Sequence, residues 1–220
     1  MMSKATTLLL ALAGVLSGAV SSVQAQDAAA GEKKAAQCLG CHGIPGYQSS
    51  FPEVLRVPMV AGQNAAYIVA ALNAYKKGER RHPTMRAIGS GLNDVDMADL
   101  AAFYEQKGAA LVKPVSDSTP PAPPAAVAAL LTQGACASCH GVNYNKPLVP
   151  AYPKLAGQYA DYLFASLRAY GVEGNPHVGR ANAVMSGVVK PYKRAELKAM
   201  ADYLSTLPGD LRLVPNRRFK

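Results

Sequence analysis

A pentapeptide that occurs twice constrains the fold of this chain more than any other feature. Residues 38–42 read Cys-Leu-Gly-Cys-His and residues 136–140 read Cys-Ala-Ser-Cys-His, and together they contain all four cysteines of the 220 residues. Cys-x-x-Cys-His is the attachment signature of c-type haem. The spacing suits this chemistry because two thiols must reach two vinyl groups on one porphyrin edge while the adjoining imidazole meets the iron. The sequence therefore predicts two covalently bound haem c groups.

The motif also predicts which residues hold each haem. The two cysteines form thioether bonds, and the histidine that follows them is the proximal ligand of the iron. The predicted attachment residues are Cys38, Cys41, Cys136 and Cys139, and the predicted proximal ligands are His42 and His140.

Disulfides and zinc are the two alternative uses of these cysteines. Disulfides are common in exported chains, but they do not explain the close pairing or the histidine after each pair. Zinc-binding Cys-x-x-Cys pairs usually lie about 15 to 20 residues apart, whereas the first cysteines of these two motifs lie 98 positions apart. Haem attachment accounts for the pairing, the histidines and the repetition together.

The first 25 residues have the pattern of a secretory signal peptide. Lys4 precedes an apolar run from Thr7 to Val20, and small and polar residues then lead to a cleavage position after Ala25. The run is shorter than the roughly 20 apolar residues of a membrane span. We therefore expect an exported mature protein, with a retained N-terminal anchor as the alternative.

The mature chain consists of two copies of one unit. Residues 61–63 read Ala-Gly-Gln and return 95 positions later as residues 156–158, and Met85 returns as Met185. Between the copies, residues 113–124 contain five prolines. Proline removes a backbone donor and clashes inside a helix, so this segment is expected to be a stiff, extended linker. The predicted domains are residues 26–112 and 125–220, here called unit one and unit two.

Each unit shows the apolar spacing of three helices. They are expected over 28–39, 65–76 and from residue 93 or 94 onward in unit one, and over 125–137, 159–170 and about 197–207 in unit two. No stretch alternates apolar and polar residues, so no sheet is expected. A unit of about 90 residues is close to the size at which a core becomes marginal. The prediction is an all-α fold in which each haem completes the core of its unit.

Each iron needs a sixth ligand from later in its unit. Met85 and Met185 are the candidates because they occupy equivalent positions in a loop, 47 and 49 residues after the first cysteine of their motif. His/Met ligation is also ordinary in electron-carrying cytochromes c. His82 and His177 are the alternatives, although they do not match each other in position. The remaining methionines of the mature chain are interpreted as core residues: Met59, Met97 and Met200.

The formal charge of +9 is concentrated in the second unit. Unit one has nine Lys and Arg against eight Asp and Glu, whereas unit two has twelve against five. Such asymmetry can orient a protein toward an acidic redox partner or an anionic membrane surface; a merely solvated basic surface is the alternative. Binding to nucleic acid is not expected of an exported haem protein.

These features together resemble the diheme cytochromes c4 over essentially the whole mature chain. They are the signal peptide, the paired haem motifs, the Ala-Gly-Gln repeat and the segment 91–104, Gly-Leu-Asn-Asp-Val-Asp-Met-Ala-Asp-Leu-Ala-Ala-Phe-Tyr. The resemblance implies two class I cytochrome c domains related by pseudo-twofold symmetry, located in the periplasm. It also implies a non-catalytic electron carrier, without a small-molecule substrate, between a respiratory donor and a terminal oxidase. Unit two departs from the pattern at residues 188–193, which puts Met185 in more doubt than Met85.

Two alternatives share the fold. A cytochrome subunit of a flavocytochrome c type complex would receive electrons from a tightly bound catalytic partner. A diheme enzyme, such as a peroxidase or a thiosulfate dehydrogenase, would need an iron with an open or unusual ligand position, and the pairing of Met85 with Met185 argues against one.

Overall fold

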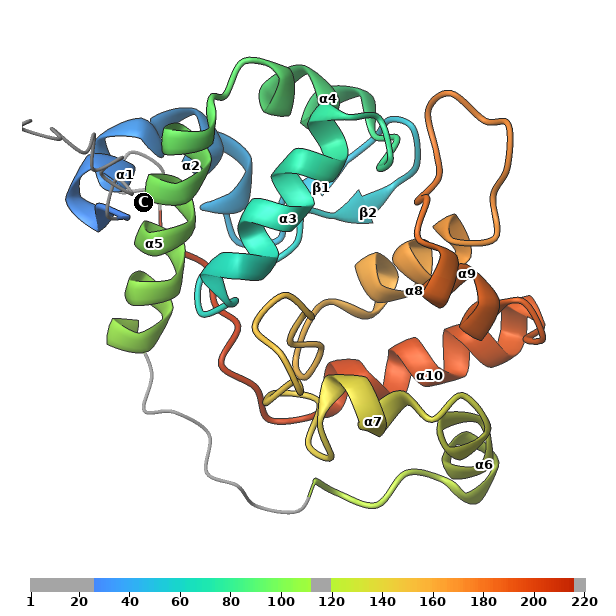
Figure 1. The fold of residues 1–220 in the computed structure, drawn as a ribbon. Coiled ribbons are helices and arrows are strands. Elements are labelled where there is room, and N and C mark those ends of the chain that lie inside the picture. Colours follow the sequence, from blue (N-terminus) through green and yellow to red (C-terminus); the bar gives the residue numbers. More distant parts are fainter. Residues whose placement is uncertain (1–25, 112–119, 216–220) are drawn as a thin grey trace, which may run out of the picture.

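A computed structural model describes residues 26–111 and 120–215 (Figure 1). The predicted signal peptide, most of the predicted linker and the basic residues of the last five positions lie outside the described residues. None of the described helices combines the length and the apolar character needed to cross a membrane.

The two units have the same order of helices. Unit one contains α1 (Ala28–Lys34), α2 (Ala36–His42), β1 (Gln48–Ser49), β2 (Leu55–Arg56), α3 (Ala65–Lys76), α4 (Pro83–Ser90) and α5 (Asp94–Leu111). Unit two contains α6 (Ala125–Gln133), α7 (Cys136–His140), α8 (Ala160–Ala169), α9 (Ala183–Val189) and α10 (Arg194–Thr206).

The predicted all-α fold is confirmed, but each unit has five helices where the sequence predicted three. The first predicted helix of each unit is broken, at Ala35 in unit one and at Ala135 in unit two, where Ala135 has a left-handed φ of 47°. The predicted methionine loops are themselves short helices, α4 and α9. The expectation of no sheet is wrong at one place, because β1 and β2 form a short antiparallel pair.

The core of unit one forms where α1 crosses α5. Gly31 is the buried residue of α1, and it lies directly against the backbone of Asp99 and the side chain of Phe103 on α5. Phe103 is 1% exposed. The crossing is this close because glycine has no Cβ, which lets one helix backbone approach the other.

Adding a methyl group at this crossing is expected to destabilise unit one. A Cβ at Gly31 would lie 2.0 Å from the carbonyl oxygen of Asp99, so the helices must separate. We expect Gly31→Ala to lower the free energy of unfolding by about 2 to 3 kcal/mol, measured by urea titration of the circular dichroism. Gly187→Ala is the matched control, because a Cβ there meets nothing within 4 Å. A loss as large in the control would contradict the crossing as the cause.

A partly buried ion pair lies beside the same crossing. The carboxylate of Asp99 accepts hydrogen bonds from Lys34 Nζ at 2.7 Å and from the backbone N–H of Asp27 at 3.0 Å. The hydrogen bond from Lys34 is the main reason that the pKa of Asp99 lies below its usual value. The bond from Asp27 ties the start of α1 to α5, and the bond from Lys34 ties its end.

This pair predicts how the stability of unit one depends on pH. The pKa of Asp99 is lower in the folded than in the unfolded chain, so its contribution is complete above the ordinary Asp pKa of about 4 and is lost as the pH falls through the folded-state value. We expect the free energy of unfolding to fall below about pH 4, and Asp99→Asn to flatten that fall. The control is Asp202→Asn, which removes an exposed pair with Lys198. Equal slopes for Asp99→Asn and the wild type would refute this account.

Reciprocal hydrogen bonds join the two units with pseudo-twofold symmetry. Gln63 binds the backbone of Lys154 through both ends of its amide, at 2.9 and 3.0 Å. Gln158 binds the backbone of Met59 in the same way, at 3.1 and 2.8 Å. Gln158 lies 95 positions after Gln63, and Lys154 lies 95 positions after Met59. The Ala-Gly-Gln repeat of the sequence therefore marks the interface.

A second reciprocal set lies further along the interface. The N–H of Arg81 donates to Gly179 O at 2.8 Å, and the N–H of Ala181 donates to Glu79 O at 2.7 Å. Arg80 and Arg180 lie opposite each other between these two bonds. This symmetry relates positions that are 100 residues apart.

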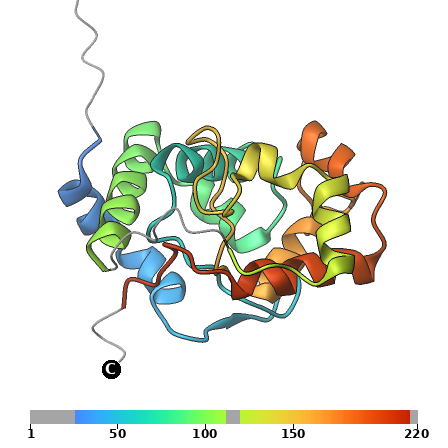
Figure 2. The ribbon, with the colours of Figure 1, turned by 90° about the horizontal axis from the view of Figure 1, so that it is seen from below.

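The segment after α10 runs back from unit two onto unit one (Figure 2). Leu211 is 1% exposed, and Arg212 exchanges two backbone hydrogen bonds with Ala61, at 2.9 and 3.2 Å. Val214 then packs against the core of unit one. Unit two therefore supplies part of the packing of its neighbour.

The third predicted helix begins differently in the two units. In α5, Asn93 Oδ1 accepts from the N–H of Asp96 at 2.8 Å, and Asp96 Oδ2 accepts from the N–H of Asn93 at 3.2 Å. In α10, Glu196 accepts from the N–H of Lys193 at 2.6 Å, but the lysine side chain carries only donors and cannot return a bond. A missing capping oxygen costs about 1 kcal/mol.

Candidate haem-binding sites

Two short helices carry the haem motifs. Residues Cys38, Cys41 and His42 lie on α2, and α7 consists of the second motif alone. A single helical turn brings the first cysteine of each motif close to the histidine, because residues three and four apart share a face. All four thiols are free of disulfides, and each is partly buried.

Both motif histidines are held in the same way. Nδ1 of His42 lies 2.8 Å from Pro58 O, and Nδ1 of His140 lies 3.1 Å from Pro153 O. A carbonyl oxygen only accepts, so Nδ1 carries the proton in each ring and Nε2 keeps its lone pair for a metal. Burial lowers the pKa of the His42 and His140 imidazoles below their ordinary value, which favours the neutral, ligating form.

In unit two, three of the four predicted site residues meet at one cavity. Cys136, His140 and Met185 line a space of about 40 Å³, whereas Cys139 is not among the lining residues. Apart from these three residues and Tyr192, the lining is aliphatic or thioether: Leu131, Leu155, Leu167, Val188, Val189, Met200 and Leu204. An apolar cavity with an imidazole, a thioether and a thiol at its walls fits the chemistry of haem c.

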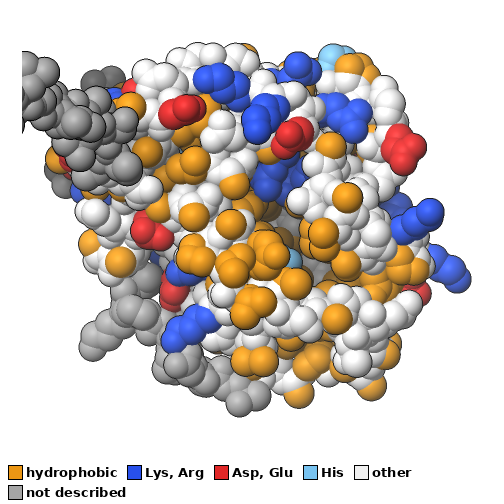
Figure 3. Space-filling model, in the orientation of Figure 1, with side chains coloured by type: hydrophobic (Ala, Val, Ile, Leu, Met, Phe, Trp, Pro, Cys, Tyr) orange, Lys and Arg blue, Asp and Glu red, His pale blue; other side chains and the backbone are white. Residues whose placement is uncertain are grey.

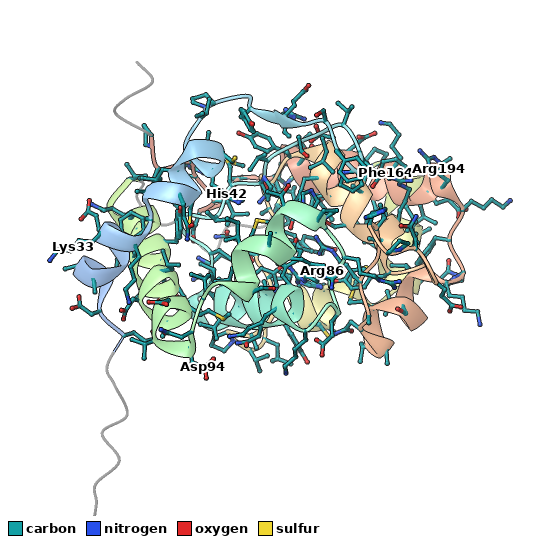
Figure 4. The ribbon with its side chains drawn as sticks, turned by 90° about the horizontal axis from the view of Figure 1, so that it is seen from above. Lys33, His42, Arg86, Asp94, Phe164 and Arg194 are labelled. Carbon is teal, nitrogen blue, oxygen red and sulfur yellow. The ribbon has the colours of Figure 1, made fainter. Side chains whose placement is uncertain are left out.

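Unit one places its predicted residues in the equivalent positions. Cys38 packs against the core, and the hydroxyl of Tyr104 lies beside its thiol. Burial raises the pKa of Cys38 and of Tyr104. Met85 is half-buried on α4, as Met185 is on α9. His42 lies on α2 at the unit-one end of the molecule (Figure 4).

The helices that carry the two methionines begin with equivalent capping residues. Nδ1 of His82 accepts from the N–H of Met85 at 3.5 Å, and Oδ1 of Asn182 accepts from the N–H of Met185 at 3.0 Å. Sequence reasoning considered His82 as an alternative iron ligand and missed this role. The common spacing of three residues before each methionine was the signal that could have revealed it.

His177, the other alternative ligand, is not among the residues that line the cavity of unit two. It is exposed, and its ring packs 5.5 Å from the ring of Phe51.

A cluster of arginine and tyrosine fills the interface between the units. Arg80 donates to the hydroxyl of Tyr67 at 3.0 Å, and Arg180 donates to that of Tyr162 at 3.1 Å. Each guanidinium also lies over a second ring, 5.7 Å from Tyr75 and 5.5 Å from Tyr170 respectively. Sequence reasoning missed both arginines, although they lie 100 positions apart like the two methionines.

The two guanidiniums have no carboxylate partner in the part of the chain that the structure describes. Within residues 26–111 and 120–215, neither Arg80 nor Arg180 pairs with a carboxylate, although both are buried at the interface. A buried charge without a partner is costly. The propionate carboxylates of a haem are anions of the kind that would satisfy them, so this cluster also fits haem-containing units.

Comparisons with known proteins agree with this geometry. The cytochrome c family profile matches residues 124–208. Cytochrome c4 of Pseudomonas aeruginosa is 30% identical over 83% of this chain and 90% of its own length. The thiosulfate dehydrogenase electron acceptor of Stutzerimonas stutzeri is 30% identical over 89% of this chain and 94% of its own.

A solved structure of a cytochrome c4 is also similar to this chain. The structure of reduced recombinant cytochrome c4 from Pseudomonas stutzeri matches with a TM-score of 0.61 and 28% identity, covering 84% of this chain and all of that one. The match spans both units, in agreement with the repeated fold and the symmetric interface. The chain therefore belongs to the diheme cytochrome c4 family, whose two cytochrome c domains each carry one covalently bound haem c.

Proposed function

We propose that this protein is a periplasmic, non-catalytic carrier of single electrons between a respiratory donor and a terminal oxidase. The observation that supports it most is the pair of equivalent motifs, each with an imidazole held through Nδ1 and a methionine on a later helix, which in unit two line one cavity. A pair of similar sites on one chain suits electron relay, whereas an enzyme needs a site that can open to substrate.

The proposal assigns a role to each predicted site residue. The domains are residues 26–112 and 125–220, joined by the linker 113–124 and preceded by a signal peptide cleaved after Ala25. Cys38, Cys41, Cys136 and Cys139 attach the two haems, His42 and His140 are the proximal ligands, and Met85 and Met185 are the distal ligands.

The bound haem supplies a single iron that changes between the ferric and ferrous states. The chain sets the conditions for that change. A neutral thioether at Met85 or Met185 favours the ferrous state and raises the reduction potential, and the apolar lining of the cavity excludes water and acts in the same direction. Pro58 and Pro153 fix the orientation of the imidazoles. If a histidine and a methionine hold each iron, no position would be left there for oxygen.

Arg80 and Arg180 would hold the acidic edges of the two haems at the interface. The guanidiniums lie opposite each other across the pseudo-twofold axis, so both edges would be drawn to one buried place. This arrangement would shorten the distance that an electron travels between the two haems, and so would support electron transfer from one unit to the other.

The test uses the matured, full-length protein. We expect two reversible one-electron steps in a redox titration, low-spin spectra for both haems, and rapid oxidation of the reduced protein by oxidase-containing membranes from its own source cells. Failure of the membranes to oxidise the protein, with intact haem spectra, would contradict the assignment to a terminal oxidase.

A second candidate function is electron acceptance from a catalytic partner. The similarity to a thiosulfate dehydrogenase electron acceptor supports it. In that case a purified dehydrogenase of this kind, supplied with thiosulfate, should reduce the protein rapidly and at low concentration, while the oxidase-containing membranes should oxidise it slowly.

A further inference from the structure

The corner between α9 and α10 has the opposite charge to its symmetry mate in unit one. Unit two is basic there, whereas unit one has polar and acidic residues at the matching positions. The residues of the corner are Lys190, Lys193 and Arg194, and their equivalents 100 positions earlier are Ser90, Asn93 and Asp94.

This basic corner breaks the local rules for the start of a helix. The N-terminus of a helix carries a partial positive charge and favours acidic residues, yet Lys193 and Arg194 stand where α10 begins. In unit one Asn93 supplies a capping oxygen, whereas Lys193 at the matching position of unit two has no side-chain oxygen. A local rule that is broken without compensation in the fold often marks a functional surface.

The three cations are available to a partner. All three are exposed, and within the described parts of the chain none of them forms an ion pair. The Arg194 guanidinium lies 5.1 Å from the centre of the Phe164 ring, which holds it in place (Figure 4). Lys and Arg side chains project from the edge of the molecule where α9 and α10 meet (Figure 3).

The corner also adjoins the cavity of unit two. Met185, Val188 and Val189 of α9 line that cavity, and Val184 on the outer side of the same helix is 69% exposed. A partner that docks on α9 would therefore be separated from the cavity by one short helix. An exposed apolar residue on the helix that leads to these three cations suits a redox protein whose own surface has an apolar area next to acidic residues.

The equivalent corner of unit one does not offer such a surface. Asp94 and Asp96 lie in the first turn of α5, and Lys34 pairs with Asp96 at 2.8 Å. Asp94 and Arg194 lie toward opposite ends of the molecule (Figure 4). An acidic partner would be attracted to one end only.

We propose that the α9–α10 corner is the docking surface for an acidic redox protein that exchanges electrons with unit two. This inference rests on the proposed function as an electron carrier. An acidic partner then docks at unit two, and unit one is expected to contact a partner of different charge.

The test exchanges the corner for its symmetry mate. The variant Lys190→Ser/Lys193→Asn/Arg194→Asp carries the residues of unit one and regains a capping side chain, so it should fold at least as well as the wild type. The control Lys33→Asp/Lys77→Asp makes the same change in net charge at exposed positions of unit one. The probe is an acidic flavodoxin in its hydroquinone form, and stopped-flow absorbance records its reduction of each protein at low ionic strength.

We expect the rate constant with flavodoxin to fall about tenfold or more in the corner variant, and much less in the control. Reduction by the cation hexaammineruthenium(II) should not fall in either. Equal losses in the two variants would overturn the docking surface while the carrier function stands. Failure of the wild-type haems to accept electrons from both reductants would instead refute the carrier function.

Two further measurements identify other occupants of the corner. If the wild type self-associates in sedimentation at low salt and the corner variant does not, the occupant is a second copy and the proposal is overturned. If the wild type and the control bind vesicles of equal parts phosphatidylcholine and phosphatidylglycerol and the corner variant does not, the occupant is a membrane surface and the proposal is likewise overturned.

Discussion

Replacement of Cys136 and Cys139 by alanine is expected to unfold unit two. Without thioether attachment the haem is no longer held in place, and the apolar lining of the cavity loses the group that it packs against. Removal of one aromatic side chain from a core already costs about 3 to 5 kcal/mol, and a haem has several times the apolar surface of such a side chain. The expected loss is comparable to the whole stability of a small domain, about 5 to 15 kcal/mol.

The measurement is far-UV circular dichroism together with limited proteolysis of the exported protein. The helices of unit two, α6 to α10, should be lost, and cleavage should concentrate within residues 125–206. The matched variant Cys38→Ala/Cys41→Ala should act on unit one in the same way. If unit two keeps its full helix content without haem, the cavity is not an essential part of its core.

The second large effect is expected at the two distal methionines. Met85→Ala and Met185→Ala should each abolish the methionine-to-iron absorption of one haem and lower the reduction potential of that haem on the order of 0.1 V or more. The fall follows because water or another harder ligand would replace the thioether and would favour ferric iron. The measurement is a redox titration followed by optical spectra.

Met97→Leu is the control for this experiment. Met97 is fully buried in the core of unit one, so the exchange should leave both potentials nearly unchanged and cost less than about 1.5 kcal/mol of stability. A haem that keeps its spectrum after loss of Met85 or Met185 would show that another side chain binds its iron.

The sequence alone predicted the repeated units and the longer helices. The boundaries of α3 agree with the prediction of residues 65–76, because its apolar residues recur at helical spacing over three turns. The short helices α4 and α9 were mistaken for loops. Each has only two turns, which is too short for the apolar period to show, and α4 depends on Pro83 in its first turn and on a cap from His82.

The interface could not be predicted in the same way. The amides of Gln63 and Gln158 bind backbone more than 90 positions away, and such contacts leave no local pattern in a sequence. The repeat did mark these glutamines as special, but it carried no information about their partners. The pairing of Arg80 with Arg180 depends likewise on how the units face each other.

The return of the C-terminal segment onto unit one has a consequence for the order of folding. Ala61 receives its backbone partner from Arg212, and Val214 covers part of the core of unit one. A chain that emerges N-terminus first on export therefore presents unit one, with its haem motif, before the segment that completes it is available. The packing of unit one is therefore complete only when the segment that follows α10 has been synthesised and has folded back onto it.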